Sequence, residues 1–216
     1  MIAGLMRPPR LLRACFPQIT WCGDRGAGRV FLTFDDGPHP EFTPRVLDIL
    51  GNFQVKATFF VVGARARAHP RIVRRIVGDG HTLGNHSYDH RRMAFRRREW
   101  IAQQLGATQR CIGEITGGAP RWFRPPYGVF DGGVLRVAGE LGLKTVIWSL
   151  TPYDTGGADG RRIVGRVMGW VRDGDIIDLH DGHARSGRVV AGLEDLVSAL
   201  RARGLKPDGL GGVENA

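Results

Sequence analysis

The sequence contains only three cysteines in 216 residues, Cys15, Cys22 and Cys111. Their number and spacing match neither a zinc ribbon nor a disulfide framework. One disulfide bridge is compatible with this number, but no other feature favours it. The sequence also lacks an apolar run long enough to span a bilayer. These absences exclude a small disulfide-stapled domain, a cysteine-bound zinc module and a membrane-spanning chain.

The N-terminus lacks the features of a secretory signal. The stretch MIAGLMRPPRLLRACFP has three arginines by residue 13 and no apolar segment of adequate length. We therefore expect the chain as given to be cytoplasmic, and exported only if a leader has been removed. No feature of the sequence indicates an oligomeric state.

Basic residues outnumber acidic ones, with 31 Lys and Arg against 21 Asp and Glu and a net charge of +10. Such a balance is compatible with nucleic acid or an anionic membrane surface as partner. The arginines are spread along the chain, and the densest group is Arg91, Arg92, Arg96, Arg97 and Arg98. Because no nucleic-acid-binding motif accompanies this group, we interpret it as a solvated face and expect no specific nucleic-acid partner.

Short apolar strands alternate with helical patterns along most of the chain. Strands are expected at 29–34, 56–63, 81–86, from 121, 144–150 and 175–180, and helices at 41–53, 69–80, 96–116, 134–143, 161–174 and 189–204. The first of these helices has Thr43 at the predicted N-cap and Pro44 at the first helical position. Such alternation predicts an α/β fold with a parallel sheet. With six or seven units in one domain, a closed or nearly closed barrel over residues 29–216 is expected, after an irregular segment over 1–28.

Polar residues capable of chemistry fall at or just after the C-terminal ends of these predicted strands. They are Asp35, Asp36, His86, Arg124, Asp154 and His180. In parallel barrels this rim carries the active site. Residues placed for structural reasons alone would be scattered along the strands, so the pattern favours a functional site.

The motif HSYDH holds two histidines four residues apart, His86 and His90. On a helical turn this spacing puts both imidazoles on one face, within reach of one metal ion. A histidine pair alone is a weak signal, but a nearby carboxylate strengthens it. Either Asp35 or Asp36 can be the third ligand, and the other carboxylate would then lie beside the water to be activated.

Two further motifs contribute a cationic side chain and a histidine. Arg124 in RPPYG offers a planar cation that suits a carboxylate, and the following turn can aim a backbone N–H at an oxyanion. Taken alone, this stretch is more typical of a structural turn than of a functional site. His180 in DLHDG ends a predicted strand, where it can serve as a general acid or simply complete the structure.

The segments TFDDGP, NHSYDH, RPPYG and DLHDG, in this order, closely resemble the signature motifs of polysaccharide deacetylases of the nodulation chitooligosaccharide deacetylase type. The resemblance covers about residues 29–203. It implies a distorted (β/α) barrel with a parallel sheet, usually of seven strands. It also implies metal-dependent removal of N-acetyl groups from glycans that contain N-acetylglucosamine, of chitooligosaccharide or peptidoglycan type.

The resemblance assigns the acidic and metal-binding roles residue by residue. Asp35 matches the general base. Asp36, His86 and His90 match the ligands of a divalent metal ion, which we expect to be zinc.

The remaining roles fall on four other matched residues. Arg124 matches the residue that orients the base, and the backbone N–H of Tyr127 matches the oxyanion donor. His180 matches the general acid, and Asp154 matches the aspartate that tunes it.

The chain departs from the family pattern in one motif. The family usually has Asp-x-x-Asp-Trp where this chain has TPYDT, so Thr151 replaces the first Asp and Thr155 the Trp that walls the acetyl pocket. Catalysis is expected to survive, while the preferred glycan is left open. The pattern also leaves unexplained Asp178, a carboxylate inside a predicted apolar strand that needs a partner or a wet site.

Two other functions compete with a glycan deacetylase. One is a non-catalytic barrel that binds a glycan or another anionic polymer, and the other is a hydrolase of a small N-acyl compound. A missing base, ligand or acid would favour the first of these, but all three are present in the sequence.

Overall fold

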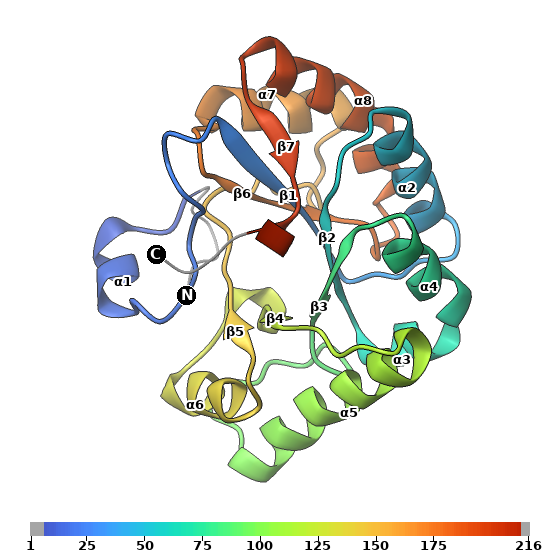
Figure 1. Cartoon of the computed structure of the whole chain (residues 1–216). Coiled ribbons are helices and arrows are strands. Elements are labelled where there is room, and N and C mark those ends of the chain that lie inside the picture. The colour runs from blue at the N-terminus through green and yellow to red at the C-terminus, as the bar shows by residue number, and fades with distance from the viewer. Residues whose placement is uncertain (1–6, 213–216) are drawn as a thin grey trace.

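The computed structural model describes residues 7–212, in which helices surround a curled sheet (Figure 1). The strands are β1 (Arg29–Asp35), β2 (Thr58–Val61), β3 (Thr82–Asn85), β4 (Trp122–Phe123), β5 (Lys144–Thr145), β6 (Ile176–His180) and β7 (Lys206–Asp208). The helices are α1 (Arg10–Cys15), α2 (Phe42–Asn52), α3 (Gly63–Ala68), α4 (Pro70–Gly78), α5 (Arg98–Thr116), α6 (Gly132–Glu140), α7 (Gly160–Trp170) and α8 (Gly187–Ala202). Two short 3₁₀ helices, η1 (Pro126–Gly128) and η2 (Leu210–Gly212), complete the elements.

The seven strands form one parallel sheet in the order β5-β4-β3-β2-β1-β6, with β7 also paired to β1. The register of β1 and β6 places Asp35 beside His180. A parallel bridge between Leu150 and Ile177 joins the chain after β5 to β6 and brings the two ends of the sheet together. The predicted distorted α/β barrel with a parallel sheet is confirmed.

Apolar residues fill both sides of the curled sheet. The outer cluster lies between the strands and the helices, and α2 contributes Val46, Leu47 and Leu50. The inner cluster consists of Phe31, Phe60, Trp122, Val146, Ile176 and Leu210. The backbone N–H of Leu210 in η2 donates to Thr58, the first residue of β2. Since η2 thus covers the beginnings of the strands, the polar residues at their C-terminal ends lie at the opposite end of the barrel.

The N-terminal segment is more ordered than the sequence suggests. The prediction of an irregular segment over 1–28 is wrong for its described part, because α1 forms there and Thr20 pairs with Val146 beside β5. The predicted boundaries at residues 1 and 216 lie outside the described residues. The short elements α3 and β7 were not expected, since neither carries a clear periodic pattern.

The predicted start of the first helix is also wrong. Helix α2 begins at Phe42 after Glu41, which caps it without a side-chain hydrogen bond, so Pro44 is not the first helical residue. The Thr43 hydroxyl accepts a hydrogen bond from the His39 backbone at 2.8 Å and donates one to Asp181. This hydroxyl therefore satisfies a buried carboxylate instead of capping the helix.

Among residues 7–212, no helix has both the length and the apolar composition that crossing a membrane requires. Cys15, Cys22 and Cys111 are all free thiols, so none of them forms the one bridge that the sequence allowed.

Candidate active site and metal centre

The paired aspartates at the end of β1 converge on one histidine. Asp35 is the last residue of β1, and Asp36 follows with a φ of 71°, in the left-handed region. The Nε2 atom of His86 lies 3.7 Å from Asp35 Oδ2 and 3.4 Å from Asp36 Oδ1. The unusual backbone at Asp36 therefore brings both carboxylates to one side, although neighbours on a regular strand point to opposite faces.

Asp36, His86 and His90 present three ligand atoms within 4.8 Å of one another. Asp36 Oδ1 lies 2.9 Å from Nε2 of His90. On the other edge of the His86 ring, Nδ1 lies 2.7 Å from the carbonyl oxygen of Arg124. Because a carbonyl only accepts, Nδ1 donates this hydrogen bond, which leaves Nε2 as the ring nitrogen available to a metal ion.

The two histidines meet across a loop, so the predicted helical turn is wrong. Residues 86–90 follow β3 without helical structure, and Ser87 and His90 have φ values of 64° and 59°. The side chain of Asn85 accepts from the backbone of Ser87, and the Ser87 hydroxyl accepts from the backbone of His90. These two hydrogen bonds stabilise a non-helical loop at the place where a helical turn was expected.

The chemistry of this cluster fits a divalent cation. Asp36 Oδ1 is buried and accepts no well-aligned hydrogen bond within residues 7–212. Burial by itself would raise the pKa of Asp36, but the imidazoles of His86 and His90 outweigh it and hold this pKa well below its usual range. Two imidazole nitrogens and one ionised carboxylate are a ligand set typical of zinc and similar ions, and they leave positions for water and substrate.

The second aspartate is held by a buried arginine. Arg124 follows β4, and its Nη1 lies 2.7 Å from Asp35 Oδ1, 2.8 Å from the Thr33 hydroxyl and 3.3 Å from Asp178 Oδ1. The guanidinium also lies over the ring of Phe60, 4.2 Å from its centroid. This network fixes Asp35 beside the metal-binding cluster.

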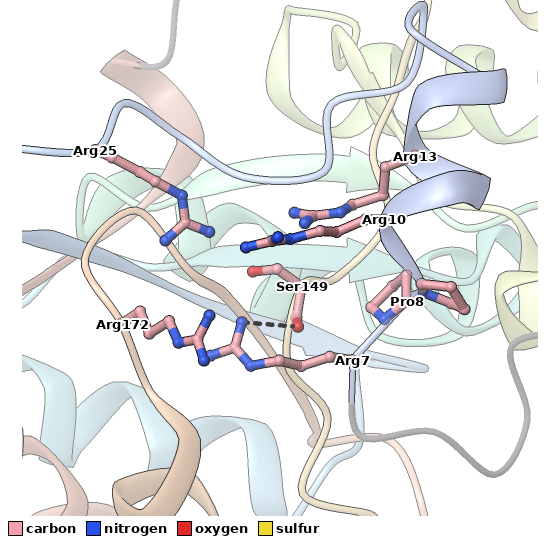
Figure 2. A pocket seen from close by; sticks show the side chains of 8 residues that line it. Arg7, Pro8, Arg10, Arg13, Arg25, Ser149 and Arg172 are labelled. Carbon is pink, nitrogen blue, oxygen red and sulfur yellow. Dashed lines mark hydrogen bonds between the residues drawn. The ribbon is translucent and has the colours of Figure 1, made fainter.

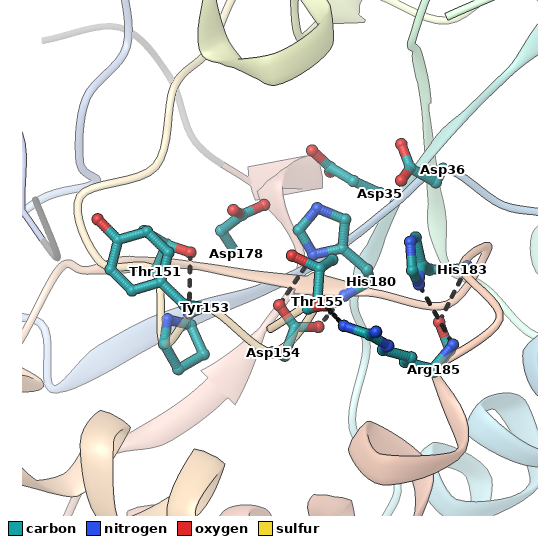
Figure 3. Close-up of polar contacts among 12 residues, drawn as sticks. Asp35, Asp36, Thr151, Tyr153, Asp154, Thr155, Asp178, His180, His183 and Arg185 are labelled. Atoms are coloured by element: carbon teal, nitrogen blue, oxygen red, sulfur yellow. Dashed lines mark hydrogen bonds and ion pairs between the residues drawn. The ribbon is translucent and has the colours of Figure 1, made fainter. Parts of the chain in front are cut away.

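The same network supplies the partner that Asp178 needs. Asp178 lies in β6 opposite Thr33 of β1, and its side chain points into the barrel near Asp35 (Figure 3). Burial, and secondarily the charge of Asp35, raise the pKa of Asp178 to about 7, while His180 and Arg124 act in the opposite direction. The charged residue that was unexplained in an apolar strand thus belongs to the site.

His180 ends β6 and is oriented by Asp154. Its Nδ1 lies 2.9 Å from Asp154 Oδ1, and its backbone N–H donates to Asp154 Oδ2 at 2.8 Å (Figure 3). Burial lowers the pKa of His180, but the charges of Asp154 and Asp178 outweigh it and raise this pKa well above its ordinary value. Asp35, Asp178 and His180 have ligand-type atoms within 4.8 Å of one another. The imidazole of His180, whose protonated form these two carboxylates favour, therefore stands across from the Arg124-bound carboxylate.

Tyr127 lies at the rim of this site. It is the central residue of η1 with a φ of 60°, and its ring centroid lies 4.7 Å from that of His90. The side chain is 53% exposed, and the guanidinium of Arg92 lies over its ring. Tyr127 is thus close enough to the histidine pair to contact a substrate held there.

The two residues that depart from the family pattern differ in exposure. Thr151 is buried, and its hydroxyl accepts from the backbone of Tyr153 at 3.4 Å. Thr155 is half-buried, and its carbonyl accepts from the side chain of Arg185 at 3.2 Å (Figure 3). Only Thr155 is therefore open to contact with a large ligand.

Sequence reasoning missed two residues that position the loop after β1. Arg65 in α3 donates to the backbone carbonyl of Asp36 at 2.7 Å and to that of Gly182. A Cβ added at Gly182 would lie 2.1 Å from the Asp36 backbone, so only glycine fits there. The glycine of DLHDG was a possible signal, but Arg65 was indistinguishable from the other surface arginines.

The sequence profile of the family described as polysaccharide deacetylase matches residues 23–146. A chitooligosaccharide deacetylase of Azorhizobium caulinodans is 38% identical over 187 residues, covering 81% of this chain and 89% of the relative. The crystal structure of a peptidoglycan N-acetylglucosamine deacetylase has a TM-score of 0.88 at 32% identity, covering 94% of this chain and 95% of the other. A pseudoenzyme of carbohydrate esterase family 4 from Bacillus anthracis has a TM-score of 0.82 at 29% identity, covering 88% of this chain and 66% of the other.

Proposed function

Since this chain belongs to the polysaccharide deacetylase family, we propose that it hydrolyses the N-acetyl groups of chitooligosaccharide or peptidoglycan with zinc bound by Asp36, His86 and His90. The observation that carries the proposal is the convergence of two differently held carboxylates at the end of β1. Asp36 faces two imidazole nitrogens, whereas Asp35 is bound by Arg124. One site thus contains a ligand set and a separate base.

When bound, the cation supplies a Lewis acid for the acetamide carbonyl and makes a water molecule easier to deprotonate. Asp35 is placed to take the proton of the attacking water, since its Oδ2 faces the ligand cluster while Oδ1 is fixed by Arg124. The bond to this guanidinium holds the carboxylate in one orientation.

His180 completes the reaction from the opposite side. Its Nδ1 is engaged by Asp154, which leaves Nε2 to deliver a proton to the departing amine. The backbone N–H of Tyr127 donates to the negatively charged oxygen that forms on the acetyl carbon. The water adds to the carbonyl carbon, the C–N bond breaks, and acetate and a free amine leave.

The two substrates rest on the similarity to relatives of both kinds. The curated relative from Azorhizobium caulinodans is a chitooligosaccharide deacetylase, and the solved structure with 95% coverage is a peptidoglycan deacetylase. Both glycans carry N-acetylglucosamine, so the same acetamide chemistry serves either one.

A non-catalytic barrel is the second candidate, because one similar structure is that of a pseudoenzyme. In this chain, however, the aspartate pair, both histidines of the ligand cluster and the Asp154–His180 pair are all present and in contact. This completeness favours catalysis over binding alone.

The proposal is tested by measuring acetate release from chitooligosaccharides, peptidoglycan and small N-acetyl compounds, before and after chelation and after zinc is restored. We expect chelator-sensitive release from at least one of the two glycans. Acetate release from the small compounds alone would show that the substrate is a small N-acetyl compound and not a glycan. No release from any substrate with zinc bound would favour the non-catalytic barrel.

A further inference from the structure

A second charged cavity lies away from the proposed active site, at the beginning of β6. It has a volume of about 470 Å³ and is lined by Arg7, Arg10, Arg13, Arg25 and Arg172, together with Ser149 (Figure 2). Asp175, which precedes β6, is bound by Arg7 of this lining, whereas His180 ends the same strand. Five residues of strand span about 16 Å, so the cavity is remote from the chemistry at His180.

One carboxylate faces this group of arginines, and it is already fully engaged. Asp175 is completely buried and is bound by Arg7 at 2.9 Å, by the Ser149 hydroxyl at 3.0 Å and by the backbone N–H of Arg172 at 2.7 Å. Arg25 lies 3.7 Å from the same carboxylate. A single negative charge therefore stands against five guanidinium groups.

The nearby Asp173 does not reduce this excess within the cavity. Its carboxylate accepts hydrogen bonds from the backbone N–H groups of Gly26 and Arg29, at the edge of the preceding loop. Arg25 contacts only the backbone carbonyl of Asp173. Asp175 is thus the acidic side chain that offsets part of the positive charge of the cavity, and an excess of positive charge is left.

Two donors in the cavity, the Nε atoms of Arg7 and Arg13, are buried and have no acceptor within residues 7–212. The other lining arginines, Arg10, Arg25 and Arg172, are exposed at its mouth. Figure 2 shows the side chains of Arg10, Arg13 and Arg25 entering from one side, and those of Arg7 and Arg172 from the other. Like charges brought together around buried N–H donors without an acceptor favour an anion between them.

We propose that this cavity binds a phosphate group. An arginine fork pairs with carboxylate or phosphate, but a carboxylate has two oxygens in one plane and Asp175 already fills that role. A phosphate presents oxygens in several directions and a larger charge, which matches donors that approach from opposite sides. The volume exceeds that of one phosphate, so a diphosphate or the phosphate of a lipid headgroup also fits.

The site is independent of the deacetylase proposal, because none of its residues touches the cluster at His86 or His180. It would hold the enzyme to a phosphate-bearing molecule or surface while the other end of the barrel faces the glycan. Substitutions in the cavity are therefore expected to change phosphate binding without changing the turnover of a soluble glycan.

The test is calorimetric titration of the full chain with inorganic phosphate and with pyrophosphate at physiological ionic strength. In parallel, the chain is co-sedimented with vesicles of phosphatidylglycerol and with vesicles of phosphatidylcholine alone. The pocket variant is Arg10→Gln/Arg13→Gln, with Arg172→Gln as a second, single change. The control is Arg71→Gln/Arg161→Gln, which removes the same charge from exposed arginines on α4 and α7.

We expect saturable binding that weakens at least tenfold in the pocket variants and by less than twofold in the control, with unchanged turnover of a soluble glycan. Binding of pyrophosphate or phosphate would identify a free anion as the ligand. Binding to phosphatidylglycerol vesicles alone would identify a lipid headgroup. Equal weakening in the control, or saturable binding of neither the anions nor the vesicles, would overturn the proposal.

Discussion

Nη1 of Arg124 lies 2.7 Å from Oδ1 of Asp35, and both side chains are almost completely buried. Taking two charges out of water is costly, and their attraction offsets this cost only with good geometry and further hydrogen bonds. The same Nη1 also contacts Asp178 and Thr33. A single cation therefore supports two carboxylates, so losing it has a larger effect than losing either acid.

This arrangement predicts the effect of Arg124→Gln on stability. Breaking a buried pair by removing one partner typically costs about 3–5 kcal/mol, because the remaining charge is left unpaired. We expect the free energy of unfolding to fall by about this amount in urea denaturation. Adding Asp178→Asn to the variant should recover part of the loss, since it removes one unpaired carboxylate. Additive losses in the double variant would show that Asp178 and Arg124 do not interact.

Removing the base should affect turnover and leave the metal in place. General-base catalysis contributes on the order of 10²–10⁴-fold, and Asp35→Asn keeps the shape of the side chain while removing its charge. We expect kcat to fall within or beyond that range, with metal content unchanged. Asp195→Asn, on the exposed face of α8, serves as the control and should retain full activity. A change of less than tenfold in kcat for Asp35→Asn would exclude Asp35 as the base.

The metal content of purified variants should distinguish the proposed metal ligands from other histidines. His86→Ala removes one of the three proposed ligand atoms, and we expect the purified variant protein to lose its bound metal along with its activity. His69→Ala, at the start of α4, changes a histidine outside the cluster and should keep both. Metal analysis by mass spectrometry measures the content. Full zinc occupancy in His86→Ala would contradict the assignment.

Much of this site could be predicted from the sequence because its residues follow the ends of apolar strands. Asp35, His86, Arg124 and His180 each stand at such an end, and parallel pairing brings those ends to one rim. The contacts within the rim follow from the family resemblance and could not be predicted from the apolar pattern alone. Whether Asp35 or Asp36 faces the histidines depends on one left-handed backbone angle, which the apolar pattern does not encode.

The two incorrect predictions from the sequence, a helical turn between His86 and His90 and a helix cap at Thr43, have a similar cause. A spacing of four between His86 and His90 suits a helix, but side-chain hydrogen bonds from Asn85 and Ser87 hold an irregular loop instead. Thr43 is a good N-cap residue by type, yet its hydroxyl binds Asp181, a partner 138 residues away. In each case a contact made elsewhere in the structure overrides the local preference of the sequence.

A buried histidine outside the site should make stability depend on pH. Nδ1 of His81 accepts a hydrogen bond from the backbone of Ala57 at 3.1 Å, so the ring is neutral in the folded state. Burial, and secondarily the charge of Lys56, lower the pKa of His81 from 6.5 to about 4. The unfolded chain binds the extra proton first, so this contribution is present above pH 6.5 and is lost as pH falls toward 4.

The variant His81→Asn tests this dependence, because the amide oxygen can accept the same hydrogen bond without titrating. A tenfold change in a proton equilibrium is worth about 1.4 kcal/mol, so His81 accounts for at most about 3.5 kcal/mol of the loss. We expect the unfolding free energy of the variant to fall less steeply than that of the parent chain between pH 6.5 and pH 4. Parallel curves for the two proteins would contradict this role.

The altered wall of the proposed acetyl pocket leads to a prediction on specificity. Trp148 does not replace the missing aromatic side chain, because it is buried between Gly128 and Arg124 in the interior. Thr155 is half-buried and follows Asp154, the partner of His180. A tryptophan buries about 150–250 Å², so its absence leaves either a wider groove at this position or a gap that a neighbour such as Tyr153 fills.

We therefore expect Thr155→Trp to change the choice of substrate more than it changes stability or zinc content. The ratio of kcat/KM on short chitooligosaccharides to kcat/KM on peptidoglycan should shift several-fold, or about 1 kcal/mol of differential transition-state binding. The bulkier peptidoglycan should lose more, since the new ring narrows the groove beside His180. Thr155→Val is the control, because it removes the hydroxyl without adding an aromatic surface, and it should leave the ratio unchanged. If tryptophan lowers both values equally, position 155 does not shape the groove, and Thr155 does not occupy the place of the family tryptophan.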